Sequence, residues 1–158
     1  MCLGGGSSAM EEEYQRQLAE EEARQARIEQ GKENIDAAFA GYDDDFYRGV
    51  ATDYMNYATP QIEDQYTDAM KALRIALARS GQMQSSERID RENELKRKLA
   101  AQEIAAARKG ESIANAMRTN LANVKSNLLT QNASLADPTL IASTAANQIM
   151  ANTQVPEY

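Results

Sequence analysis

The sequence predicts an all-α, extended protein of about five helices, one of them long and in the C-terminal half, completed by packing with other subunits. Strong helix formers dominate, and the 158 residues contain only three Pro. Apolar residues recur at helical spacing, without strand-like alternation. Leu, Ile, Val and Phe together make only 25 residues, and Trp is absent. Because ordering the backbone costs about 1–2 kcal/mol per residue, we expect neighbouring subunits to supply much of the buried surface.

The N-terminal part is predicted to be a flexible Gly/Ser arm, residues 1–9, followed by a helix from Met10 to about Ala40. The arm contains three consecutive glycines and shows no periodicity. Glu11 to Glu13 are expected in the first helical turn, where carboxylates favour the positive end of the helix dipole. Gly41 is expected to cap the helix at its C-terminus.

Two further helices are predicted in the rest of the N-terminal helical region, residues 10–81. The first begins with Asp43 or Asp44 as its N-cap. The next begins with Thr59 as N-cap and Pro60 as the first helical residue, and ends at Ser80-Gly81. Aromatic residues concentrate around these helices, and we expect them to form a packed joint between helices; they are Phe39, Tyr42, Phe46, Tyr47, Tyr54, Tyr57 and Tyr66.

Residues 86–151 are predicted to form a long alanine-rich helix, from Ser86 to about Leu135, and a short helix that starts at Asp137-Pro138. Gly110 weakens the middle of the long helix. Residues 152–158 are expected to form an extended tail, since Pro156 forbids a helix. The long helix carries a thin apolar stripe that we expect to contact other helices: Leu95, Leu99, Ile113, Met117, Leu121, Val124 and Leu128.

Charge is distributed unevenly along the chain, whose formal net charge is −7. Residues 1–60 are strongly acidic, whereas residues 61–158 are nearly balanced. The most basic stretch, Arg88 to Lys109, interleaves basic with acidic residues. This pattern is typical of a solvated or salt-bridged helix face and not of a track for DNA phosphates.

Catalytic, cofactor and metal sites are not expected. His is absent, Cys2 is the single cysteine, and no nucleophile motif or Gly-rich phosphate loop occurs. No apolar run approaches the roughly 20 residues of a membrane span, and the start lacks a signal peptide. We therefore expect a non-enzymatic protein that is made in the cytoplasm.

Four features allow a second interpretation. Asp43 to Asp45 are expected either to cap a helix or to hold a metal ion. The helix face formed by Phe46, Tyr54 and Tyr57 is expected either to pack in a core or to stack on nucleic-acid bases. Cys2 is a free thiol or a modified one. The nearly uncharged residues 126–151 pack against subunits or contact a membrane. The first alternative is preferred in each case.

The order of these segments resembles the internal virion, or DNA ejection (transfer), proteins of short-tailed bacteriophages. Those proteins begin with a Met-Cys and glycine-rich arm, followed by a charged helix, an aromatic and acidic turn, and an alanine-rich helical body. The resemblance covers roughly residues 1–135. It is carried by residues 1–6 (MCLGGG), 23–28 (ARQARI), 35–47 (IDAAFAGYDDDFY), 57–66 (YATPQIEDQY), 76–81 (ALARSG) and 85–86 (SS).

The resemblance implies a virion structural protein, located in the capsid interior or the portal and tail lumen, that helps form the passage for DNA delivery. The implied partners are portal and tail proteins, other ejection proteins and copies of the same chain. Genome DNA would pass nearby without sequence-specific binding, and membrane contact would follow ejection. Two alternatives stay open: a head-to-tail connector or tail-tube subunit, and a non-viral helical scaffold or adaptor.

Overall fold

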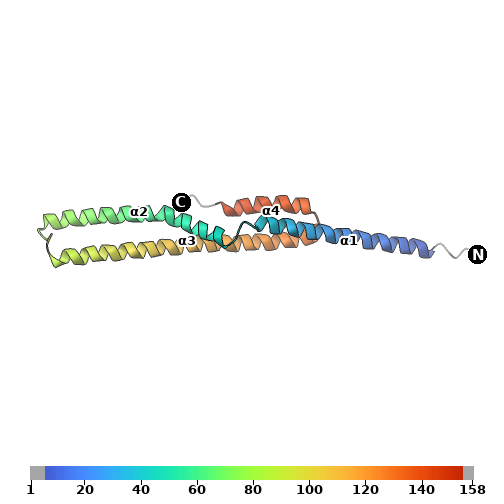
Figure 1. The fold of residues 1–158 in the computed structure, drawn as a ribbon, viewed down its shortest axis with the longest axis horizontal. Coiled ribbons are helices and arrows are strands. Elements are labelled where there is room, and N and C mark those ends of the chain that lie inside the picture. The colour runs from blue at the N-terminus through green and yellow to red at the C-terminus, as the bar shows by residue number, and fades with distance from the viewer. Residues whose placement is uncertain (1–5, 155–158) are drawn as a thin grey trace, which may run out of the picture. The chain divides into compact units, whose positions relative to one another are not determined.

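The computed structural model describes residues 6–154, with side chains from residue 8 onward. Within that range the chain is all-α, as predicted (Figure 1). It contains four helices and not five: α1 (Gly6–Phe39), α2 (Asp44–Arg79), α3 (Ser86–Leu135) and α4 (Pro138–Thr153). α3 is continuous through Gly110.

The helices belong to two compact units. Unit 1 contains residues 6–42 and 119–154, and unit 2 contains residues 43–118. Each unit therefore combines a segment of the predicted region 10–81 with a segment of the predicted region 86–151. The apolar residues of α3 serve different units on the two sides of residue 118.

The prediction of a helix break at Thr59-Pro60 is wrong, because α2 runs through Pro60. A proline inside a helix removes one hydrogen bond and crowds a carbonyl, at a cost of about 3 kcal/mol. Buried Ala58 and Leu77 anchor α2 on both sides of the proline. The side-chain amide of Gln61 also donates to the Tyr57 carbonyl at 3.4 Å. Packing therefore outweighs the local stop signal.

The first helix begins at Gly6, earlier than the predicted Met10. Glu11 to Glu13 consequently lie beyond its first turn, which contains no acidic residue. Extending an existing helix adds one hydrogen bond per ordered residue, so the long helical run continues into residues predicted to belong to the arm. Residues 1–5 of that arm and residues 155–158 of the predicted tail lie outside the described residues.

Most predicted helix ends are confirmed. Asp43 caps α2 by accepting a hydrogen bond from the Phe46 N–H at 2.9 Å. Ser80-Gly81 ends α2, with Gly81 in the left-handed region at φ 70°. Gly41 is not in that region; the chain instead leaves α1 through a turn in which the Tyr42 N–H donates to the Phe39 carbonyl.

The core of unit 1 lies where α1, the end of α3 and α4 meet (Figure 1). Its fully buried residues are Ile35 from α1, Leu128 from α3, and Ile141 and Ala145 from α4. Full burial of an Ile or Leu side chain stabilises a fold by about 1.5–3 kcal/mol. A core this small makes the polar contacts around it important.

Three side chains of α1 donate hydrogen bonds to backbone carbonyls at the connection between α3 and α4. Arg24 donates to Ala133 O at 3.1 Å, Arg27 to Ala136 O at 3.2 Å, and Asn34 to Pro138 O at 3.2 Å. The last carbonyls of a helix lack partners within it, and cations there favour the negative end of its dipole. The two arginine bonds therefore hold α1 against the end of α3, and the Asn34 bond holds it against the start of α4.

At Gly31, α1 lies directly against the side chain of Asn132 of α3. A Cβ atom at this position would lie 1.9 Å from Asn132 Oδ1. The Asn132 side chain is 1% exposed and donates through Nδ2 to Ile28 O at 2.7 Å. The contact requires glycine on one helix and a short polar side chain on the other.

Unit 2 is an antiparallel pair formed by α2 and the first part of α3 (Figure 1). The turn between them is closed by Gln82 N–H donating to Leu77 O at 3.0 Å and by Ser85 Oγ donating to Gln82 O at 2.8 Å. Farther along the pair, a Cβ at Gly110 would lie 2.8 Å from the backbone carbonyl oxygen of Ala51. Gly110 therefore permits backbone contact between the two helices and does not break α3.

Candidate interaction surface

The N-terminal part of α1, residues 8–23, is the most exposed helical stretch of the described chain. We call it the exposed α1 segment. Each of its side chains is exposed, and Figure 1 shows this part of α1 extending beyond the other helices of unit 1. Glu, Gln, Ala and Leu give the segment high intrinsic helix propensity. Its helical form is thus set locally, but nothing in the described chain covers it.

Three large apolar side chains form a stripe along this segment. Met10, Tyr14 and Leu18 recur at steps of four residues, which places them on one side of a helix. They are 76%, 59% and 42% exposed. The stripe was not predicted from the sequence, although the regular spacing of its three residues is a signal that identifies it.

Two groups of carboxylates accompany the stripe. Glu11 to Glu13 lie between Met10 and Tyr14, and Glu20 to Glu22 follow Leu18, with Arg16 as the segment's only basic residue. Glu21 pairs with Arg24 at 3.5 Å, whereas the other five carboxylates form no ion pair within residues 8–154. Tyr14 and Leu18 therefore lie between two acidic clusters, and Met10 precedes the first cluster.

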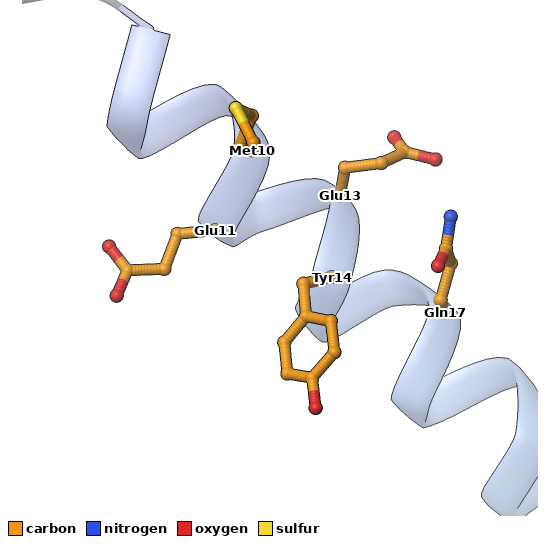
Figure 2. A pocket seen from close by; sticks show the side chains of 5 residues that line it. All are labelled: Met10, Glu11, Glu13, Tyr14 and Gln17. Atoms are coloured by element: carbon orange, nitrogen blue, oxygen red, sulfur yellow. The ribbon is translucent and has the colours of Figure 1, made fainter.

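A shallow hollow on this segment is lined by five residues of α1, shown in Figure 2. In Figure 2 the side chains of Met10, Glu13 and Tyr14 stand out from a single helix, and no second element closes the hollow. Small-molecule sites bury most of their ligand's surface. This hollow is suited instead to a helix or another flat surface.

The predicted aromatic residues are divided between the two units. Phe39 and Tyr42 lie in unit 1 as an edge-to-face pair with ring centroids 6.4 Å apart. In unit 2, Tyr47 is buried, and the Arg118 guanidinium lies 4.7 Å from the centre of its ring. The remaining members lie along α2: Phe46, Tyr54 and Tyr66 are half-buried, and Tyr57 is exposed.

The predicted apolar stripe of α3 lies on the inner sides of the two units. Its members in unit 2 are half-buried Leu95, Leu99 and Ile113 and buried Met117. Its members in unit 1 are buried Leu121 and Leu128 and half-buried Val124. The stripe is therefore used within the chain, and the role predicted for it in contacts with other subunits stays a prediction.

The acidic residues at the start of α2 have local partners. Asp43 caps the helix, Asp44 pairs with Arg118 at 2.6 Å, and Asp45 pairs with Arg48. Among residues 6–154 no group of three or more metal-binding side chains converges on one point. The capping interpretation of Asp43 is confirmed.

One ion pair of unit 1 lowers the pKa of a carboxyl group. Lys125 Nζ lies 2.7 Å from Asp36 Oδ1, and its hydrogen bond and positive charge hold the pKa of the Asp36 carboxyl below its ordinary value. The same ammonium lies 5.8 Å from the centre of the Phe39 ring. Because the folded-state pKa is lowered, the pair stabilises the fold above the unfolded pKa of Asp36, and this contribution is lost as the pH falls through the folded pKa.

We expect Lys125→Gln to raise the Asp36 carboxyl pKa towards its ordinary value, because the substitution removes both the hydrogen bond from the ammonium and its Coulomb attraction. Carboxyl carbon chemical shifts, followed by NMR across a pH titration, measure this directly. Lys71→Gln, which removes a cation paired with Asp68 elsewhere, is the control and should leave Asp36 unchanged. An Asp36 pKa equal in wild type and Lys125→Gln would contradict the pairing.

No helix among residues 6–154 combines the length and apolar character needed to cross a bilayer. Residues 126–151, for which membrane contact was an alternative, supply Leu128, Ile141 and Ile149 as buried residues in unit 1. Comparison with known protein families, curated proteins and solved structures finds no match to this chain.

Proposed function

We propose that this chain is a structural protein of a short-tailed bacteriophage virion, of the internal virion or DNA ejection class. It works in several copies, which contact portal and tail proteins and help to form the passage for DNA. The resemblance of residues 23–28, 35–47 and 57–66 to such proteins supports the class. The exposed α1 segment supports a role that depends on contacts with other subunits.

The exposed α1 segment is the observation that carries this proposal. Most helices in proteins gain much of their stability from packing of one face. Here sixteen consecutive residues are exposed although Met10, Tyr14 and Leu18 offer an apolar face. A partner that covers this face would supply the missing packing. In an assembly, a neighbouring subunit stays in contact with this face.

The proposed role is geometric and not catalytic. The chain's carboxylates lie mainly on exposed helix faces. Asp36 and Glu94 have pKa values lowered by Lys125 and Lys98 respectively. A general acid at neutral pH requires the opposite shift. Long helices instead pack side by side, and helices packed in this way form the wall of a passage.

The test is mass spectrometry of purified virions that carry this gene, compared before and after genome release. We expect the polypeptide in intact particles at several copies and its loss when the DNA leaves. Retention after release would replace the ejection role with that of a connector or tail-tube subunit. Absence from intact particles would overturn the proposal.

A matched pair of variants tests whether the exposed α1 segment mediates incorporation. Met10→Ser with Tyr14→Ser removes two exposed apolar side chains from the segment, and Ile75→Ser with Ile89→Ser removes two that lie outside it. We expect the first pair to reduce the copy number in virions at least tenfold and the second to leave it near wild type. Equal losses from both pairs would refute a special role for the segment.

A further inference from the structure

A basic surface on α3 matches the exposed α1 segment in charge and pattern. Along residues 96–109, the side chains that face solvent include Ala100, Ala101, Ile104 and Ala105, and Ile104 is 54% exposed. This mainly apolar stretch also contains exposed Gln102 and half-buried Glu103. Lys96 to Lys98 lie at one end of this apolar stretch and Arg108-Lys109 at the other. We call this surface the basic α3 face. It belongs to unit 2, and the exposed α1 segment belongs to unit 1.

The two surfaces are complementary in order as well as in sign. Tyr14 and Leu18 lie between the two acidic clusters of the α1 segment, and a mainly apolar stretch lies between the two basic clusters of the α3 face. At ~1.5 Å per helical residue, the centres of the acidic clusters are separated by ~13 Å and those of the basic clusters by ~17 Å. Both clusters of one surface can therefore meet both clusters of the other while the apolar stretches lie in contact.

The charges on these surfaces are largely without local partners. Within residues 8–154, Lys96, Arg97, Arg108 and Lys109 form no ion pair, and Lys98 pairs with Glu94 at 2.8 Å. The charged heads extend from long side chains, so they adapt to a partner at little steric cost. Opposite charges across an interface speed association and select the partner, whereas like charges disfavour it.

We propose that the exposed α1 segment of one copy of this chain docks on the basic α3 face of a second copy. Docking of two α1 segments on each other is disfavoured, because residues 11–22 contain six Glu and one Arg. The interface joins two different surfaces, so the pair of copies still offers one free surface of each kind after the first contact. Such contacts propagate into rings or filaments.

This inference deepens the proposed function by naming one contact between copies, but it depends only on the charges and exposure of the purified chain. Failure of self-association would leave detection in virions unaffected. Conversely, absence from virions would leave the measured association unaffected. The two proposals can therefore fail separately.

The experiment measures the mass of the full chain by sedimentation velocity over a range of concentrations and salt. We expect association at low salt that weakens as NaCl is raised, since the contacts are exposed charge pairs. Glu13→Lys with Glu20→Lys should weaken association at least tenfold, and so should Arg97→Glu with Arg108→Glu. Glu63→Lys with Asp64→Lys, an equal charge change on exposed positions of α2, is the control and should associate like wild type.

Mixing identifies the two surfaces. Each reversal variant retains one intact surface of the complementary kind, so an equimolar mixture should associate although neither variant does so alone. A chain that carries both reversals has the charge pattern exchanged and should associate again. Circular dichroism checks that every variant keeps the wild-type helix content. A wild-type monomer at all concentrations, reversal variants that associate like wild type, or variants that fail to associate on mixing would each overturn the proposal.

Discussion

Gly110→Leu is expected to lower the free energy of unfolding by about 1–3 kcal/mol, the usual cost of overpacking a close contact. Even a Cβ atom at this position would lie 2.8 Å from the carbonyl oxygen of Ala51. The neighbour is backbone, so it moves only if α2 shifts as a whole. Buried residues along the pair, such as Val50 and Met117, would then lose contact.

The control is Gly49→Leu, because Gly49 is exposed and nothing lies within 4 Å of a Cβ atom there. Replacement of a helical glycine by a better helix former should stabilise α2 by roughly 0.5–1 kcal/mol. Thermal and urea unfolding of both variants beside wild type measures the difference. Gly→Leu is thus expected to lower the free energy of unfolding at position 110 and to raise it at position 49. Equal melting of the two variants would show that α2 and α3 do not approach closely at Gly110.

Asn132→Asp is the second substitution expected to have a large effect, a loss of about 3 kcal/mol or more at neutral pH, as for an uncompensated buried charge. The Asn132 side chain is almost completely buried, and its Nδ2 donates to Ile28 O. A carboxylate would remove that donor and place negative charge against the carbonyl oxygen. The nearby Arg24 and Arg27 side chains already donate to the carbonyls of Ala133 and Ala136.

The loss caused by Asn132→Asp should depend on pH. Burial raises the pKa of the introduced carboxyl in the folded state above its unfolded value of about 3.9. The destabilisation should therefore be smallest below that unfolded value, where the group is protonated in both states, and should grow as the pH rises. Urea unfolding from pH 3 to 7 measures this dependence. Asn127→Asp, on an exposed site of the same helix, should show little effect, and a pH-independent loss at position 132 would contradict the buried location.

These contacts matter for the proposed role because the chain has little other stabilisation. Each unit relies on a few buried aliphatic residues, close helix contacts at Gly31 or Gly110, and side chains that satisfy helix ends. Long thin units of this kind retain large exposed surfaces. The proposed function uses those surfaces for contacts with other subunits.

Helix boundaries marked by local chemistry were predictable from the sequence. The Asp43 cap, the Ser80-Gly81 end, the start at Ser86 and the Asp137-Pro138 start depend on backbone groups within a few residues. The break predicted at Pro60 was wrong because its outcome depends on the burial of Ala58 and Leu77, which local propensity does not include. The stripe of Met10, Tyr14 and Leu18 was recognisable by its spacing, but its lack of cover was not.

The sequence by itself determined the helical class, the acidic N-terminal helix and most helix ends, since propensity and capping act over a single turn or a few turns. Only the tertiary structure decided how residues distant along the chain come together. It identified Gly31 and Gly110 as close contacts, made Arg24 and Arg27 donors to the end of α3, and left residues 8–23 uncovered. Those features follow from which helices pack against each other, and helical periodicity reports an apolar face without identifying what covers it.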